Sequence, residues 1–184
     1  MQAGKSSIQF EHPPIITSAA SIVGQTEGEG PLASFFDRVE PDPTFGKKSW
    51  EEAESELQRQ TVQKCLDKAG RQAADVNCLF AGDLLGQIVA TSFGVESFDI
   101  PFFGLYGACS TMGEAMILGA MAAGAGYADR VLALASSHFA SAERQFRFPL
   151  AYGNQRPQST TWTVTGCGCV MIEGNEKNEG KNGR

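Results

Sequence analysis

The segment from Cys109 to Tyr127 limits the choice of fold more than any other part of the chain. It has the length of a helix, carries a single charged side chain, Glu114, and has glycine or alanine at many positions. A helix that is apolar all round needs burial on every side, and small residues let neighbouring elements approach its backbone closely. One sheet cannot wrap such a helix. We therefore expect a layered α/β/α/β/α stack in which a further layer covers it.

The rest of the chain alternates between predicted strands and predicted helices. Apolar runs bounded by turn residues predict strands at Pro14–Gly24, Val76–Gly82, Phe102–Ala108, Arg130–Ala135 and Val164–Ile172. Besides the small-residue segment, helices are expected from Trp50 to Ala69 and from about Gln87 to Phe93. Strands that alternate with helices favour an α/β fold with a mostly parallel sheet.

The first of these helices has clear signals at both ends. Ser49 and Glu52 have the spacing of a capping box, and Gly70 follows the last apolar position as a C-cap. Between them, apolar residues recur every three to four positions and the other face is charged or polar. The helix is therefore expected to lie on the surface of the sheet.

Composition limits the domain count and the classes of function. The 184 residues suit one domain, here predicted for residues 1–174, and the polar residues 175–184 are predicted to be a disordered tail. Acidic side chains outnumber basic ones, 21 to 15, which argues against a nucleic-acid partner. No long uncharged apolar stretch indicates a membrane span, and Met1–Glu11 lacks the apolar run of a signal peptide. We expect an intracellular protein.

The five cysteines do not have the spacing of a metal site or of a disulfide framework. They lie at positions 65, 78, 109, 167 and 169, with no C-x-x-C pair and no histidine at ligand spacing. Reduced thiols are favoured, and no metal or other cofactor is expected.

Cys109 is the first candidate for chemistry, because it stands where a predicted strand turns into the small-residue helix. Unpaired amides and the dipole at a helix N-terminus favour a thiolate or a bound carboxylate. A thiol there can act as a nucleophile. The alternative is that Cys109 is a small buried residue and that Ser110 or Thr111 caps the helix.

Four further candidates follow predicted strands. Asp83 could orient a ligand or hold a backbone amide, and the structural role is favoured. Ser136 and Ser137 could donate hydrogen bonds to a carboxylate or serve only the loop backbone. His138 could replace a catalytic base, but a single histidine is more often a structural residue.

Arg144 and Arg147 lie three residues apart and alternate with Phe146 and Phe148. Guanidinium groups and aromatic faces would suit a dianionic aromatic acid. The same residues could equally hold their loop against the body of the protein, and we favour that role slightly.

Several motifs, in order along the chain, resemble those of a known family. Gly-Ala-Cys-Ser before the small-residue helix resembles the nucleophile region of the thiolase-like superfamily, which includes ketoacyl-acyl-carrier-protein synthases. Residues 81–87 (AGDLLGQ), 135–139 (ASSHF), 143–149 (ERQFRFP) and 161–166 (TWTVTG) resemble the stage V sporulation protein AD family of spore-forming bacteria. The resemblance extends from about Ile15 to Ile172.

This resemblance implies a thiolase-like fold of two similar halves, of which the chain resembles the N-terminal half. It implies binding of dipicolinic acid, a pyridine dicarboxylate, in support of its uptake into the developing spore, together with membrane proteins of the same sporulation operon. The expected pocket lies at the start of the buried helix, with Cys109 and Ser110, Asp83, and the polar groups of Ser136, Ser137 and His138.

The resemblance also bears on catalysis. A thiolase-type enzyme takes its catalytic histidine, and a second histidine or asparagine, from its C-terminal half, and no histidine follows His138 here. We therefore expect ligand binding without catalysis. The alternatives are an acyl transferase that uses Cys109 as its nucleophile, and an interaction subunit or truncated product with no ligand of its own.

The resemblance implies an assembly as well. In the superfamily the strand before the nucleophile, here Phe102–Ala108, pairs with its copy across a two-fold axis, and we expect a homodimer. A separate chain could supply the C-terminal half. The protein is expected to be soluble or peripheral at the spore inner membrane.

Overall fold

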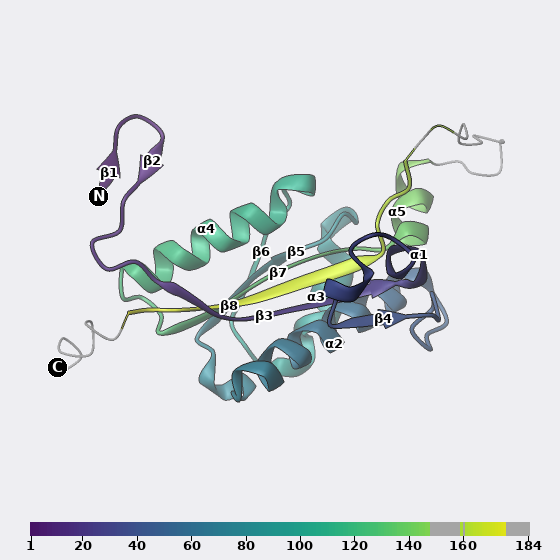
Figure 1. The fold of residues 1–184 in the computed structure, drawn as a ribbon, viewed down its shortest axis with the longest axis horizontal. Helices are drawn as coiled ribbons and strands as arrows, with labels where there is room; N and C mark the ends of the chain where they lie inside the picture. Colours follow the sequence, from purple (N-terminus) through teal and green to yellow (C-terminus); the bar gives the residue numbers. More distant parts are fainter. Residues whose placement is uncertain (148–158, 160, 176–184) are drawn as a thin grey trace.

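A computed structural model describes residues 1–147, 159 and 161–175 of the chain (Figure 1). Its centre is a six-stranded sheet in the order β4-β3-β8-β7-β5-β6. The strands are β3 (Ile15–Gly24), β4 (Arg38–Glu40), β5 (Cys78–Gly82), β6 (Phe102–Gly104), β7 (Arg130–Ser137) and β8 (Gly166–Glu173). A separate two-stranded hairpin, β1 (Gln2–Ala3) with β2 (Ser7–Ile8), precedes it.

The sheet is mostly parallel, as the alternating pattern predicted, and one strand, β8, runs against the others. β5 pairs in parallel with β6 and β7, and β3 pairs in parallel with β4. The last strand, β8, inserts antiparallel between β3 and β7. The sequence pattern locates strands but contains no signal for the direction in which a distant strand returns.

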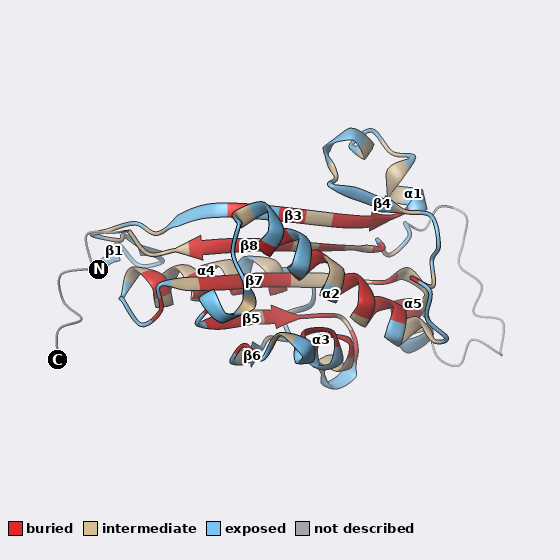
Figure 2. Ribbon diagram, turned by 90° about the horizontal axis from the view of Figure 1, so that it is seen from below, coloured by how far each residue is buried: buried red, intermediate tan, exposed pale blue. Residues whose placement is uncertain are grey.

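Helices cover both faces of the sheet (Figure 2). The α-helices are α1 (Gln25–Gly28), α2 (Trp50–Ala69), α3 (Val89–Val95), α4 (Thr111–Gly124) and α5 (Phe139–Phe146). Short 3-10 turns are η1 (Ala33–Phe35), η2 (Ala73–Asp75), η3 (Gly86–Ile88), η4 (Glu96–Phe98) and η5 (Ala108–Ser110).

α2 packs on one face of the sheet and forms the larger part of the core. The predicted capping box is present: the Ser49 hydroxyl accepts from the Glu52 amide, and the Glu52 carboxylate accepts from the Ser49 amide. Gly70 ends the helix in the left-handed conformation at φ 62°. Buried apolar residues of α2 meet Leu79 of β5 and Leu132 of β7. The sequence prediction for this helix is confirmed.

α4 packs on the opposite face, and its small residues make the close approach possible. Thr111, Ala115, Gly119 and Ala123, spaced four apart, form its buried side. A methyl group at Gly119 would lie 3.1 Å from the Ile172 Cδ1 atom, so the sheet and the helix backbone are in near contact there.

The other face of α4 is apolar and open. Ile117 is 58% exposed and Met121 is 40% exposed. The sheet of this chain thus covers one side of the helix, as expected for one layer of a larger stack.

One predicted strand is much shorter in the structure, and one short strand was not predicted. β6 has three residues instead of the seven expected, because the chain leaves the sheet after Gly104. Leu105 then packs into the cluster beneath α4. β4 was not predicted, because its three residues are too short to show periodicity.

Among the described residues, no helix is both long enough and apolar enough to span a bilayer.

Candidate functional site

Cys109 lies in the turn η5, directly before α4, and its side chain is exposed. The other four cysteines are buried. Ala108, just before it, has the left-handed φ of 48°, which is unfavourable for a residue with a side chain and is a form of strain that concentrates at functional sites. The predicted position of Cys109 at a strand-to-helix turn is confirmed, and the alternative of a small buried residue is wrong.

The hydroxyls beside Cys109 hold this turn. Ser110 precedes α4 but makes no side-chain cap bond; its hydroxyl donates to the Gly107 carbonyl at 2.8 Å. The Thr111 hydroxyl accepts from the Gly107 amide at 3.2 Å. The amides of the first turn of α4 therefore have no hydroxyl cap from Ser110, which suits an incoming anion.

Asp83 follows β5 and is buried on the α2 side of the sheet. Its Oδ1 accepts from the Leu85 amide at 2.7 Å, and its Oδ2 accepts from the amide and the hydroxyl of Thr91 at 2.7 and 2.5 Å. These bonds fasten the start of α3 to the end of β5. They are what the structural alternative for Asp83 predicts.

Ser136 and Ser137 are neighbours on β7, so their side chains point to opposite faces of the sheet. The Ser136 hydroxyl donates to Glu54 Oε1 at 2.8 Å and accepts from Gln58 Nε2 at 2.6 Å. The Ser137 hydroxyl donates to the Val164 carbonyl at 2.6 Å, which ties β7 to the segment before β8.

His138 is fully buried, and both ring nitrogens are bonded to the main chain. Nε2 donates to the Pro43 carbonyl at 2.7 Å, and Nδ1 accepts from the Ala140 amide at 3.2 Å, which caps α5. The ring stacks on Trp50 with centroids 5.6 Å apart. Burial lowers the pKa of His138, so the neutral ring is favoured.

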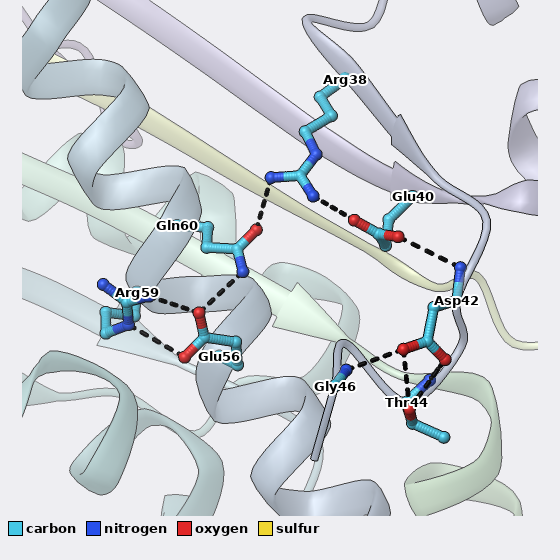
Figure 3. A network of polar contacts seen from close by, with 8 residues as sticks. All are labelled: Arg38, Glu40, Asp42, Thr44, Gly46, Glu56, Arg59 and Gln60. Carbon is cyan, nitrogen blue, oxygen red and sulfur yellow. Dashed lines mark hydrogen bonds and ion pairs between the residues drawn. The ribbon is translucent and has the colours of Figure 1, made fainter.

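The loop that carries Pro43 is itself fixed by polar contacts (Figure 3). Asp42 accepts from the Thr44 hydroxyl, and also from the Thr44 and Gly46 amides at 2.9 and 2.8 Å. These bonds lower the pKa of the Asp42 carboxyl group, with the Thr44 hydroxyl contributing most. Arg38 on β4 donates to Gln60 on α2 at 2.7 Å. The loop is thereby held against α2, so that the Pro43 carbonyl lies next to His138.

α2 contributes a second carboxylate to this network. Arg59 and Gln60 donate to the Glu56 carboxylate (Figure 3). Together with Lys47 they lower the pKa of Glu56 to about 2, with Arg59 contributing most. Glu56 also lines an open groove of about 770 Å³ between α2 and α3, in which Phe93 is 67% exposed. No predicted site residue lines this groove.

The two arginines of the ERQFRFP motif are ion-paired within the chain. Arg144 pairs with Glu51 of α2, and Arg147 pairs with Glu143 one turn earlier. Phe148 lies outside the described residues. The pairing of Arg144 with Glu51 fits the role that we slightly favoured, that of holding this segment to the body.

The predicted site residues therefore divide between the two faces of the sheet. Cys109 and Ser110 lie at the start of α4, and Ser137 shares the α4 face of β7 by alternation with Ala133. Asp83, Ser136 and His138 lie on the α2 face, bonded to α2, α3 and the loop at Pro43. The prediction that all six contact one ligand stays a prediction.

Two functional candidates were missed. Glu54 and Gln58 of α2 are fully buried and bond to Ser136, and Glu54 is also hydrogen-bonded to the Ser141 hydroxyl at 2.7 Å. A signal existed, because both stand four residues apart on the side of α2 that carries Thr61 and Cys65. A polar pair on the buried face of an amphipathic helix indicates a buried network.

Solved structures with the same fold include ketosynthases. A priming β-ketosynthase of a polyketide pathway superposes with a TM-score of 0.58 at 14% identity, over 94% of this chain and 53% of that one. The 3-oxoacyl-(acyl-carrier-protein) synthase III of Aquifex aeolicus gives 0.59 at 14% identity, over 89% and 54%. At this identity the likeness shows the thiolase-like fold alone, and it covers about half of each enzyme.

Sequence relatives are more specific. The stage V sporulation protein AD of Bacillus subtilis is 43% identical over 169 residues, which are 92% of this chain and 50% of that protein. The chain thus spans about half the length of this curated relative. The family profile described as stage V sporulation protein AD matches residues 4–181. The chain belongs to the stage V sporulation protein AD family.

Proposed function

We propose that the chain binds dipicolinic acid, without catalysing a reaction on it, in support of its uptake into the developing spore. The observation that carries this proposal is membership of the stage V sporulation protein AD family over nearly the whole chain, which implies a role in sporulation. The ligand itself is inferred from the family resemblance of the motifs at residues 81–87, 135–139, 143–149 and 161–166.

The ligand carboxylates would bind at the start of α4. Exposed Cys109 and the amides of the first helical turn are the groups available there. The hydroxyls of Ser110 and of Ser137, on the same face of the sheet, would donate to the ligand after leaving the Gly107 and Val164 carbonyls. Asp83, Ser136 and His138 would then act indirectly, by fixing the ends of β5 and β7 through their bonds on the other face.

The contacts of His138 support the proposal that the chain catalyses no reaction. A thiolate nucleophile in acyl transfer needs a partner that moves protons. Both nitrogens of His138 are engaged with the main chain, at Pro43 and Ala140. This ring would have to break two bonds before it acted as a base.

Acyl transfer by Cys109 is the second candidate. Its exposed side chain and the strained φ of Ala108 before it favour this alternative, as does the fold shared with ketosynthases. It would require acid and base groups from elsewhere in the assembly.

The open face of α4, with Ile117 and Met121, would be covered by the second half of a thiolase-like fold, in this or another polypeptide. The edge strand β6 would pair with its copy to form a homodimer. Membrane proteins of the same operon would hold the assembly at the spore inner membrane as a peripheral protein.

Calorimetric titration with dipicolinate and with picolinate, which has one carboxylate fewer, tests the proposal on the folded protein. We expect saturable heat for dipicolinate and a much weaker signal for picolinate. A parallel assay for free thiol release from acyl thioesters is expected to show none. Equal or absent heats would contradict ligand binding, and thiol release that is lost in Cys109→Ala would favour the acyl transferase.

A further inference from the structure

Glu54 is a buried carboxyl group without an ionic partner among the described residues. It lies on the inner side of α2 and is fully buried. Oε1 is bonded to the Ser136 hydroxyl of β7 at 2.8 Å, and Oε2 is bonded to the Ser141 hydroxyl of α5 at 2.7 Å. The carboxyl group therefore joins three elements: α2, β7 and α5.

The direction of the hydrogen bonds on the β7 side is fixed by Asp83. Its Oδ2 is 2.5 Å from the Thr91 hydroxyl, which donates to it, because the carboxylate already accepts from two amides. The Thr91 oxygen must then accept, and Gln58 Nε2 donates to it at 3.0 Å. The second Gln58 N–H donates to Ser136, so the Ser136 hydroxyl is left to donate to Glu54.

The Ser141 hydroxyl has one hydrogen and lies within hydrogen-bond distance of two acceptors, of which the His138 carbonyl also accepts from the Ala142 amide at 3.0 Å. Its oxygen is 2.7 Å from Glu54 Oε2 and 3.0 Å from the His138 carbonyl, which can only accept. If Glu54 is ionised, Ser141 can donate to one of them at a time. If Glu54 carries a proton on Oε2, it donates to Ser141, and Ser141 donates to His138, so that both contacts are satisfied.

We infer that Glu54 holds a proton in the folded chain, donates it to Ser141, and releases α5 from α2 and β7 when that proton is lost. The inference does not depend on the ligand proposed above. It assigns a function to a buried carboxyl group that no step of ligand binding uses.

The charges around Glu54 act in the same direction. Burial is the main cause that raises its pKa, to about 7, and the nearby carboxylates of Asp83 and Glu51 add to it, against the opposing bonds from the two serines. Cys167 of β8 faces the same space, and burial raises its thiol pKa as well, so it remains uncharged. On α5, His138 is favoured as neutral.

Among the described residues, Arg144 is the cation on α5 that contacts α2, and it does not neutralise Glu54. Arg144 pairs with Glu51, one turn before Glu54 on the helix. Ionisation of Glu54 would therefore leave two carboxylates, Glu54 and Asp83, joined through Gln58 with no positive charge between them. Moving α5 outward lets water reach Glu54, which relieves the cost of the buried charge.

Hydrogen exchange of the α5 amides as a function of pH tests the inference, on the 184-residue chain alone or bound to the polypeptide that completes its fold. Opening that exposes Glu54 lets it ionise with an ordinary pKa near 4.5 in place of about 7. After correction for intrinsic exchange, the opening equilibrium should rise about tenfold per pH unit between these values and level off above. The Ala142 and Arg147 amides, bonded within the helix, report it.

The variant Glu54→Gln keeps a donor and an acceptor in place of the protonated carboxyl group, and should exchange with little dependence on pH. The matched control is Glu52→Gln on the exposed side of α2, which should keep the wild-type dependence. A wild-type chain whose α5 opening does not change with pH would overturn the inference, as would loss of the dependence in Glu52→Gln.

Infrared spectroscopy keeps the test decisive if Glu54→Gln does not fold. The wild-type protein at pH 6 should show the carbonyl band of a protonated carboxylic acid, and the band should disappear as the pH rises past about 7. Absence of such a band at pH 6 would contradict a proton on Glu54.

Discussion

Gly82, the last residue of β5, lies directly against the main chain of Leu105. A side chain at position 82 would overlap the Leu105 carbonyl oxygen and would approach Thr111 Cγ2 to 2.9 Å. The Leu105 amide also donates to the Ala81 carbonyl at 2.8 Å. The chain therefore crosses the end of β5 on its way from β6 to Cys109, and position 82 must be a glycine for it to pass.

The variant Gly82→Ala should destabilise the protein by more than about 2 kcal/mol, because its methyl group meets backbone that cannot turn aside. The control is Gly168→Ala on β8, where nothing lies within 4 Å of a new methyl group. That change should be neutral or slightly stabilising. Urea unfolding of both variants checks this, and equal midpoints would show that Leu105 does not cross at this distance.

His138 should make stability decrease in mild acid. Burial lowers its pKa below the usual 6.5, so the unfolded chain binds a proton more readily than the folded one. This stability is present above pH 6.5 and is lost as the pH falls through the folded pKa.

Thermal unfolding between pH 7.5 and 5 of wild type and His138→Gln isolates this contribution, because other groups titrate alike in both. Relative to His138→Gln, the wild-type midpoint should decrease with acidification, because the opposite contribution of Glu54 is common to both proteins. His12→Gln should behave as wild type. Parallel curves for wild type and His138→Gln would contradict a neutral buried ring.

The open face of α4 should govern the behaviour of the isolated chain. Replacing Ile117 and Met121 with glutamine should at least roughly halve the binding of a hydrophobic dye and weaken association with a second half-fold. Burial of each of these side chains corresponds to about a 10- to 100-fold gain in affinity. Phe93→Gln, at an exposed apolar site over the other face of the sheet, should leave that association unchanged. A wild-type chain that is a monomer, binds no dye and melts sharply would contradict this view.

Much of the fold follows from local signals in the sequence. The capping box at Ser49 and the left-handed glycine at position 70 place α2 to the residue. The segment that forms α4 carries one charged residue, Glu114, which predicts that the helix needs cover beyond its own sheet. The exposed Ile117 lies on the side of α4 that this sheet does not cover.

The remaining features depend on contacts between distant segments. The insertion of β8 between β3 and β7 sets the mixed sheet, and no residue near Gly166 marks its direction. The bond between His138 and the Pro43 carbonyl spans 95 positions, so the sequence favoured a structural role for this histidine but could not identify its partner.

Alkylation of Cys109 in the presence of ligand tests the central claim most directly. Cys109 is exposed and the other four cysteines are buried, so iodoacetamide on the folded protein reports this position. With a chelator present to remove metal effects, dipicolinate should slow alkylation about tenfold or more, and picolinate should not. Equal rates with dipicolinate, picolinate and buffer, on a protein that remains folded, would contradict a dipicolinate site at the start of α4.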